Sequence, residues 1–158
     1  HKILQNLKGI FDEIIVVTNT TAMYEHLNVR LVKDLIKDKG PLGGIHSGLV
    51  NSNSNYNFIF ACDMPFINPR LVKYMSKITE NYDIIIPKLN GLFEPLHAIY
   101  SKNCISPIER QLKCNNLKII DFFKEVKVKE VTEIEIGQFL PQRAFVNINT
   151  PVDYYAQK

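Results

Sequence analysis

The alternation of short apolar runs with segments of helical periodicity constrains the fold of this chain most. The apolar runs are rich in Val, Ile and Phe and have the length of buried strands. The expected strands are 13–19, 28–34, 57–62, 83–89, 96–102, 127–135 and 144–149. The expected helical segments are 1–11, 21–27, 68–82, 103–114, 116–126 and 150–157. Strands that alternate with helices predict an α/β protein, with a mostly parallel sheet and helices on both faces in a three-layer α/β/α arrangement.

Length and charge narrow the class of protein. The 158 residues fit one domain, 1–158, and a hydrophobic share of 46% can fill its core. The 19 basic residues are scattered and nearly balance the 16 acidic ones, so neither nucleic acid nor membrane is expected as a partner. Cys62, Cys104 and Cys114 form no CxxC pair. We therefore expect free thiols and a cytoplasmic protein, not a disulfide framework or a zinc site.

In the run NFIFACDMPF, residues 57–66, an expected apolar strand is followed directly by one acid, Asp63. A polar residue that closes a strand and caps the next turn is one explanation. A metal ligand is the other, because Mg²⁺ prefers carboxylate oxygen together with substrate phosphates. Ligands of such sheets bind beyond the carboxyl ends of the strands. Asp34, Asp63, Asn147 and Asn149 all lie at or near such ends, which is the first indication of a functional site.

The segment GPLGGIHSGL, residues 40–49, is rich in glycine and is expected to be a loop that opens a helix. Close helix packing explains Gly43 and Gly44 equally well as a ligand that approaches the bare backbone. The pattern matches neither the Walker motif nor GxGxxG. His46 and His97 are isolated in the sequence and are interpreted as packed or surface residues. The chain shows no Ser/His/Asp pattern.

Four pieces of the chain together resemble a known family. GPLGGIHSGL, FACDMPFINPRLVKYM, EPLHAIY and FVNINTPVDY follow one another in the order found in the molybdenum cofactor guanylyltransferases, the MobA-like proteins. The resemblance runs from FDEIIVVTN to NINTP, which is nearly the whole chain. CDMP and NINTP together are fairly specific, whereas CDMP alone is shared with related nucleotidyltransferases. The resemblance implies a single nucleotidyltransferase domain with a Rossmann-like core.

The resemblance also implies a reaction and a site. Such an enzyme moves GMP from GTP onto the terminal phosphate of molybdopterin cofactor and releases pyrophosphate. Asp63 resembles the Mg²⁺-binding aspartate, and Asp34 the acid that contacts guanosine, with Asp38 as the alternative alignment. Gly43 and Gly44 fall in the loop near the nucleotide, and Asn147 and Asn149 near the metal and cofactor. Molybdoenzyme-maturation proteins are the further partners that this function implies.

One part of the family pattern is missing from residues 1–158. The family opens with a strand and a glycine-rich loop that cradles the triphosphate, and His1 already falls in the helix that follows. We therefore expect that an N-terminal piece belongs with this chain. Two alternative functions stay open at this stage. One is a related cytidylyltransferase or sugar-phosphate nucleotidyltransferase, and the other is a non-catalytic adaptor that holds the pterin.

Overall fold

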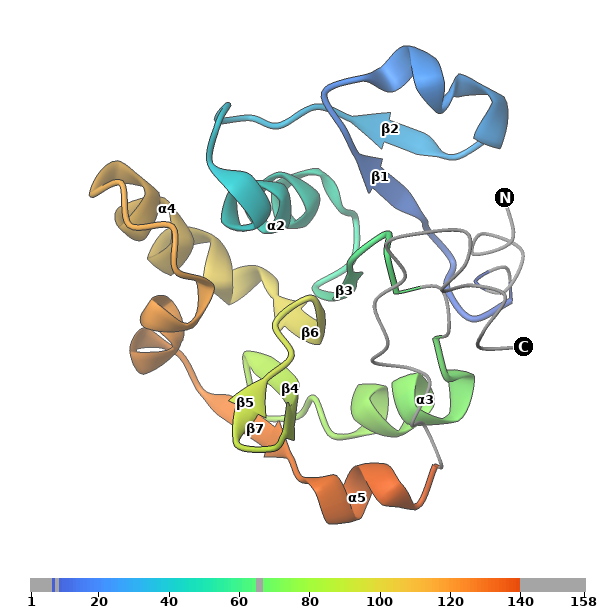
Figure 1. Ribbon diagram of the computed structural model, residues 1–158, viewed down its shortest axis with the longest axis vertical. Coiled ribbons are helices and arrows are strands. Elements are labelled where there is room, and N and C mark those ends of the chain that lie inside the picture. Colours follow the sequence, from blue (N-terminus) through green and yellow to red (C-terminus); the bar gives the residue numbers. More distant parts are fainter. Residues whose placement is uncertain (1–6, 8, 65–66, 140–158) are drawn as a thin grey trace.

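The described strands of this computed structural model form two separate sheets. The structure describes residue 7, residues 9–64 and residues 67–139. The strands are β1 (Ile15–Val17), β2 (Arg30–Val32), β3 (Tyr56–Phe60), β4 (Ile84–Leu89), β5 (Leu92–Phe93), β6 (His97–Ser101) and β7 (Val128–Val131). β1 pairs with β2 in the first sheet, while the second has the order β3-β6-β4-β5 and β7 pairs with β4 (Figure 1).

Helices cover both faces of the larger sheet (Figure 1). The α-helices are α2 (Gly40–Asn51), α3 (Pro69–Lys77), α4 (Ile105–Lys113) and α5 (Glu133–Gly137). Short 3-10 helices are η1 (Thr21–Met23), η2 (Glu25–Leu27), η3 (Lys102–Cys104) and η4 (Ile119–Glu125). α2 and α4 share one hydrophobic cluster with the strands, and α3 and α5 share another. The predicted three-layer α/β/α arrangement is thus confirmed.

Alternation along the central strands sends side chains into these two clusters. Ile84 and Ile86 pack with α2 and α4, whereas Ile85 between them packs with α3 and α5. On β6, Tyr100 and Ile99 divide in the same way. All five side chains are nearly inaccessible to solvent. Successive side chains of a strand point to opposite faces, so a continuous apolar run is what a strand buried on both faces requires.

Strand directions are more mixed than the sequence indicated. β1–β2 and β4–β7 are parallel pairs, but β6 is antiparallel to both β3 and β4. The chain passes from Leu89 to His97 through the short strand β5, and this connection is too short for a parallel crossover. β6 must therefore return antiparallel beside β4. Among the described strands, β7 pairs only with β4.

Local signals placed the start of one helix correctly and the start of another too late. Asn68, the first residue of the expected segment 68–82, caps α3: its side-chain Oδ1 accepts hydrogen bonds from Arg70 N at 2.9 Å and Leu71 N at 3.3 Å. The glycine-rich segment was expected to be a loop that opens a helix; the helix is present, but α2 (Gly40–Asn51) already begins at the first residue of the segment. The loop lies earlier, at residues 33–39. Close packing against neighbouring segments outweighs the low helix propensity of glycine here.

Several expected elements lie outside the described residues. They are the strand at 144–149, the helix at 150–157 and most of the helix at 1–11. Leu7 is described and is buried against Ile67 and Val72. Within the described part of the chain, no helix has both the length and the apolar character needed to cross a membrane.

Candidate active site

Asp34 lies just beyond β2 and is held by a residue that lies just beyond β1. Asn19 Nδ2 donates to Asp34 Oδ2 at 2.8 Å, and Asp34 N donates to Asn19 Oδ1 at 3.2 Å. β1 and β2 are parallel, so their carboxyl ends meet at the same edge of the sheet. Asn19 was not predicted from the sequence, although it is a polar residue at a strand end, as Asp34 is.

The loop that carries Asp34 is fastened to α2 by Ser47. Ser47 Oγ accepts a hydrogen bond from Leu35 N and donates one to Gly43 O, both at 2.9 Å. Ser47 is buried, and nothing in its sequence context marked it. Gly43 lies directly beneath the same loop, where a Cβ would be 2.8 Å from Lys39 Cβ and 3.4 Å from Ile36 O. Packing of loop on helix therefore explains Gly43, whereas a Cβ at Gly44 would meet nothing within 4 Å.

Substitution of the two glycines should separate these roles. Gly43→Ala is expected to lower the free energy of unfolding by about 1–3 kcal/mol, because its methyl group overpacks the contact with Lys39 Cβ. Gly44→Ala is the matched control and should leave stability unchanged or raise it, since alanine favours a helix over glycine. Urea unfolding of both variants measures the difference. Equal stability of the two variants would contradict this account of Gly43.

Asp63 follows β3 in a tight turn. Met64 N donates to Ala61 O at 3.2 Å, and Ala61 N donates to Leu96 O at 3.1 Å. The side chain of Asp63 is partly buried, and its Oδ1 has no hydrogen-bond partner among the described residues. A buried carboxylate oxygen without a donor is unfavourable unless a cation or another donor completes it. This observation favours a ligand-binding role over simple closure of the strand.

Glu94 lies in the turn that leads into β6, where His97 N donates to Glu94 O at 3.0 Å. β6 pairs with β3, and the hydrogen bond from Ala61 N to Leu96 O extends this pairing to the residues between the Glu94 turn and the Asp63 turn. Partial burial raises the pKa of the Glu94 carboxyl above its usual value. Two acidic side chains thus flank the same end of the β3–β6 pair. Glu94 was not predicted as a site residue, although it belongs to EPLHAIY, one of the pieces that carry the family resemblance.

The two isolated histidines are packed, as expected. His97 is fully buried, with its ring edge-on to Phe58 at a centroid distance of 5.1 Å. Burial lowers the pKa of His97 to about 4, so the imidazole is neutral near pH 7. His46 is buried on α2, and its Nε2 lies 3.2 Å from Glu109 Oε1 of α4. Both side chains therefore contribute to the packing between layers.

Burial of His97 predicts a pH dependence of stability. The unfolded chain binds a proton near the ordinary pKa of 6.5, whereas the folded protein resists it until about pH 4. The stabilisation is therefore complete above pH 6.5 and is lost as the pH falls toward 4. Between pH 6.5 and pH 5 the free energy of unfolding should fall by about 2 kcal/mol from this group.

His97→Leu provides the comparison for this effect. Unfolding free energies measured from pH 7 to pH 5 should decline less steeply for the variant than for the wild type. The difference between the two slopes isolates His97 from the other histidines. Parallel pH profiles would show that the folded protein accepts a proton at His97 without penalty.

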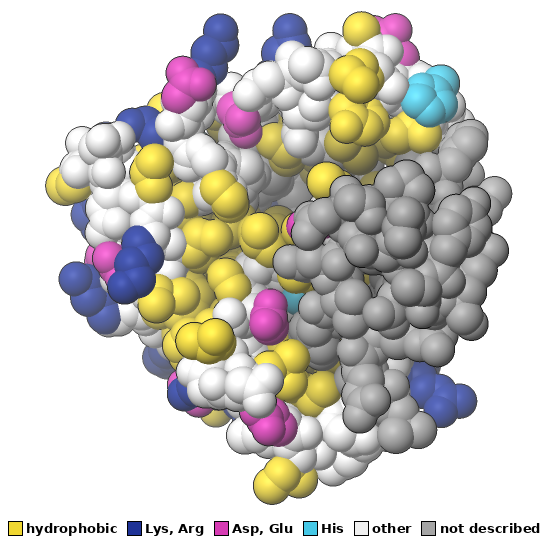
Figure 2. All heavy atoms as spheres, viewed as in Figure 1, with side chains coloured by type: hydrophobic (Ala, Val, Ile, Leu, Met, Phe, Trp, Pro, Cys, Tyr) yellow, Lys and Arg dark blue, Asp and Glu magenta, His cyan; other side chains and the backbone are white. Residues whose placement is uncertain are grey.

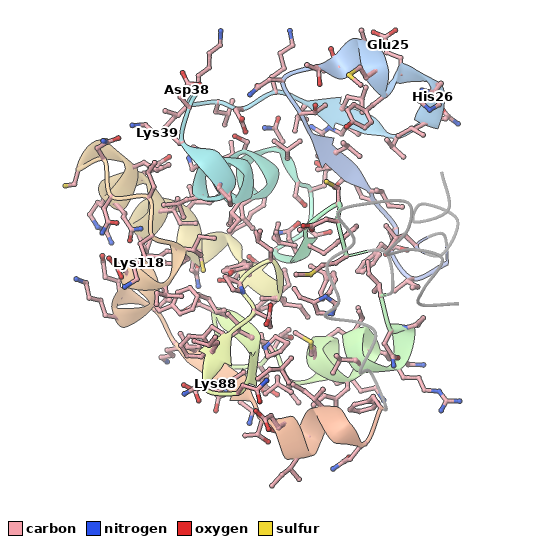
Figure 3. All side chains as sticks on the ribbon, viewed as in Figure 1. Glu25, His26, Asp38, Lys39, Lys88 and Lys118 are labelled. Carbon is pink, nitrogen blue, oxygen red and sulfur yellow. The ribbon has the colours of Figure 1, made fainter. Side chains whose placement is uncertain are left out.

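On the face of the molecule shown in Figure 2, most basic side chains lie toward the rim. In Figure 2, hydrophobic side chains gather in a band across the middle of the face, with single acidic side chains within it and most Lys and Arg side chains outside it. Asp38 and Lys39 lie at the turn into α2 (Figure 3). Lys39 Nζ donates to Asn115 Oδ1 at 2.7 Å, so this lysine connects the turn before α2 to the segment after α4. Asp38 is exposed and has a positive φ of 59°.

The structure does not bring Asp34 and Asp63 into contact in any described hydrogen bond or ion pair: Asp34 follows β2 of the first sheet, and Asp63 follows β3 of the second. A cleft lies between β1 and β3, and neither Asp34 nor Asp63 is among its lining residues. Gly44 and Cys62 line the cleft. Asn147 and Asn149 lie outside the described residues. Over the described ranges, no group of three or more His, Cys, Asp or Glu side chains could hold a metal, and Cys62, Cys104 and Cys114 are free.

Known proteins resemble this chain over most of its length. Residues 1–126 match the family model described as the MobA-like NTP transferase domain. A relative from Pelotomaculum thermopropionicum, named probable molybdenum cofactor guanylyltransferase, is 40% identical over 148 residues, which are 93% of this chain and 72% of the relative. A relative of the same name from Natranaerobius thermophilus is 39% identical over 160 residues, covering 96% of this chain and 77% of the relative.

A solved structure has the same fold. Molybdopterin-guanine dinucleotide biosynthesis protein A from Archaeoglobus fulgidus superposes with a TM-score of 0.80 and is 26% identical in sequence. The superposition covers 98% of this chain and 82% of that protein. Sequence and structure thus lead to the same group of proteins.

Proposed function

Because this chain belongs to the MobA-like NTP transferase family, we propose that it transfers GMP from GTP to molybdopterin cofactor and releases pyrophosphate. The observation that carries the proposal is identity of 39–40% to relatives named probable molybdenum cofactor guanylyltransferase over more than nine tenths of this chain. The nucleotidyltransferase fold and the acid at the end of β3 support it. No protein nucleophile is needed, because phosphoryl transfer depends mainly on positioning and on neutralisation of charge.

Mg²⁺ fits the environment of Asp63. The partly buried side chain offers an Oδ1 atom without a donor, and Mg²⁺ takes carboxylate oxygen readily. With no cluster of three acidic or histidine side chains among the described residues, Asp63 would share the ion with substrate phosphates and water. When bound, Mg²⁺ supplies charge neutralisation for the reacting phosphates. Asp63 would hold the ion at the carboxyl end of β3.

Asp34 is proposed to recognise the guanine base of GTP. Its carboxylate can accept hydrogen bonds from the N1–H and N2 amino group of guanine, and Asn19 keeps it in place through two hydrogen bonds. Ser47 holds the loop of Asp34 against α2, while Gly44 leaves room for close approach of the nucleotide to the helix backbone. Asn147 and Asn149 are proposed to lie near the metal and the pterin cofactor.

A direct assay tests the reaction. The natural polypeptide is incubated with molybdopterin cofactor, Mg²⁺ and either GTP or CTP, and pyrophosphate release and the dinucleotide product are measured. We expect product with GTP and little with CTP. Preference for CTP would assign a cytidylyltransferase, and tight binding of the pterin cofactor without turnover would assign an adaptor. Either outcome would overturn the proposal.

A further inference from the structure

Glu94 lies in the second sheet, beside the turn that carries Asp63. β6 runs antiparallel to β3, so the start of β6 lies at the end where β3 finishes. Asp63 follows β3 at this end, and Glu94 precedes β6. Among the described strands, β3 is the outermost of the second sheet, next to the cleft that separates it from β1. Glu94 therefore lies on the side of β3 that faces away from the first sheet, to which Asp34 belongs.

Backbone groups and one buried side chain hold the turn around Glu94. Glu94 N donates to Pro87 O of β4 at 3.0 Å, and Glu94 O accepts from His97 N at 3.0 Å. Tyr100 is buried on β6, and its Oη donates to Pro95 O at 2.7 Å. The turn is thus fixed without the Glu94 carboxylate. The shape of the turn therefore does not explain why an acid stands at this position.

The Glu94 carboxylate is partly buried and has no hydrogen bond or ion pair with another described residue. Burial raises the pKa of this carboxyl, because the charged form has lost part of its water and has gained no donor. A buried carboxylate without donors is unfavourable unless a ligand supplies them. Asp63 Oδ1, at the same end of the β3–β6 pair, also lacks a described donor. Two acceptor groups at one end of the sheet are therefore available to a ligand.

Apolar side chains flank Glu94. Leu92 and Phe93 form β5 directly before it, and Leu92 is 70% exposed. Phe93 is partly buried, and its ring centroid lies 5.7 Å from that of Phe123. Leu96, two residues after Glu94, lines the cleft and packs against the core. A carboxylate among apolar side chains suits a flat, largely apolar ligand that also carries N–H groups.

We propose that Glu94 determines specificity for the acceptor substrate, by accepting hydrogen bonds from the N–H groups of its pterin ring. This inference rests on the proposed function, in which the acceptor is molybdopterin cofactor. Asp34 and Asp63 are proposed to bind the guanine base and the metal, so the acceptor needs space that the guanosine does not occupy. Glu94 lies beside such space, on the side of β3 that faces away from the first sheet.

The donor pattern of a pterin matches a carboxylate. The pyrimidine half of the ring carries a 2-amino group next to a ring N–H, and the two oxygens of a carboxylate can accept from both. The terminal phosphate of the same substrate is an unsuitable partner, because both groups are anionic. Mg²⁺ also suits this place less well, since it usually keeps several waters and the side chains beside Glu94 are apolar.

Steady-state kinetics of Glu94→Gln test the proposal. The natural polypeptide is assayed with GTP, Mg²⁺ and molybdopterin cofactor, and each substrate is varied in turn. The amide keeps the size of the side chain but replaces one acceptor by a donor that faces the donors of the ring. KM for the cofactor should rise by about 10- to 150-fold, as for the loss of one hydrogen bond to a charged group, while kcat and KM for GTP stay unchanged. A structural role would not change one KM alone.

Glu80→Gln is the matched control. Glu80 is exposed in the connection from α3 to β4. β4 and β3 run in the same direction, because both are antiparallel to β6, so a residue that precedes β4 lies at the opposite end of the sheet from Asp63 and Glu94. Its substitution should change none of the three constants. Thermal unfolding checks that both variants fold.

Two small pteridines test the contact with the ring directly. 2-Amino-4-oxopteridine has the donor pair of the pterin, whereas 2,4-dioxopteridine has a carbonyl in place of the amino group. Both are measured as inhibitors competitive with the cofactor. The first should inhibit the wild type about tenfold more strongly than the second, and Glu94→Gln should lose most of this preference, because the carboxylate that requires both donors is gone.

Four results would overturn the inference. Wild-type turnover with an unchanged KM for the cofactor in folded Glu94→Gln is one, and a pteridine preference that survives in this variant is another. Recovery of normal kinetics at high Mg²⁺ would assign Glu94 to the metal, and equal changes in all three constants would assign it a structural role. A wild-type protein that converts no cofactor would instead overturn the proposed function, and this inference with it.

Discussion

Replacement of Asp63 by Asn is expected to lower guanylyl transfer by about 10²–10⁴-fold while the protein stays folded. The amide keeps the size of the side chain but loses the negative charge that would hold Mg²⁺. Because Asp63 Oδ1 has no described hydrogen-bond partner, loss of the charge breaks no described contact of that atom. Turnover is measured in the natural polypeptide with GTP, molybdopterin cofactor and a range of Mg²⁺ concentrations. High Mg²⁺ should restore part of the activity.

Glu25→Gln is the matched control for the loss of one carboxylate. Glu25 is exposed on η2, well separated from β3 (Figures 1 and 3), and its substitution should leave turnover unchanged. Thermal unfolding of both variants checks that the fold is retained. Near-normal turnover of folded Asp63→Asn at ordinary Mg²⁺ concentration would remove Asp63 from the metal site. The strand-end carboxylate would then have only a structural role.

Asp34→Ala is expected to weaken GTP binding by about 10²- to 10⁴-fold and to change CTP binding little. The reason is that hydrogen bonds to a charged partner contribute about 1.5–3 kcal/mol each, and cytosine does not present the N1–H and N2 donors of guanine. Calorimetric titrations of the wild type and the variant with both nucleotides measure the change. Asn19→Ala should produce a smaller loss of the same kind, because Asn19 only positions the Asp34 carboxylate.

The neighbouring acid serves as the control for base recognition. Asp38→Asn removes a negative charge from the same loop and tolerates the positive φ of 59° at this position, which alanine would not. Its effect on GTP binding should be small. Equal losses of GTP and CTP binding in Asp34→Ala would place Asp34 at the ribose or in loop structure. A selective loss of GTP binding in Asp38→Asn would assign the base contact to Asp38.

Much of the layer structure could be predicted from short-range patterns. Continuous apolar runs such as 84–87 identify strands buried on both faces, and Asn68 followed by Pro69 predicts the start of α3. These signals act over a few residues, so they can be read without knowing the neighbours in space. The direction of β6 was missed because the pattern of a buried strand is the same in either direction. It depends instead on the short connection through β5.

Of the candidate site, only those residues could be predicted whose type by itself suggests a function. Asp63 and Asp34 stood out because acids at strand ends are conspicuous, and the order of motifs indicated the family. Asn19, Ser47 and Glu94 were missed, because their importance comes from partners that fold against them. The sequence alone also could not assign different roles to two neighbouring residues of the same type, because their roles differ only through their surroundings in the fold.

The sequence by itself determined the α/β class, most strand positions and the family, because each depends on local periodicity or on the order of short motifs. Only the tertiary structure decided that Gly43 is a packing contact and that Gly44 faces open space, since the difference lies in Lys39 and Ile36 folding over one and not the other. It alone also showed the cleft between β1 and β3. Pairing between strands joins residues far apart in the chain, and no local pattern records which strand edges remain open.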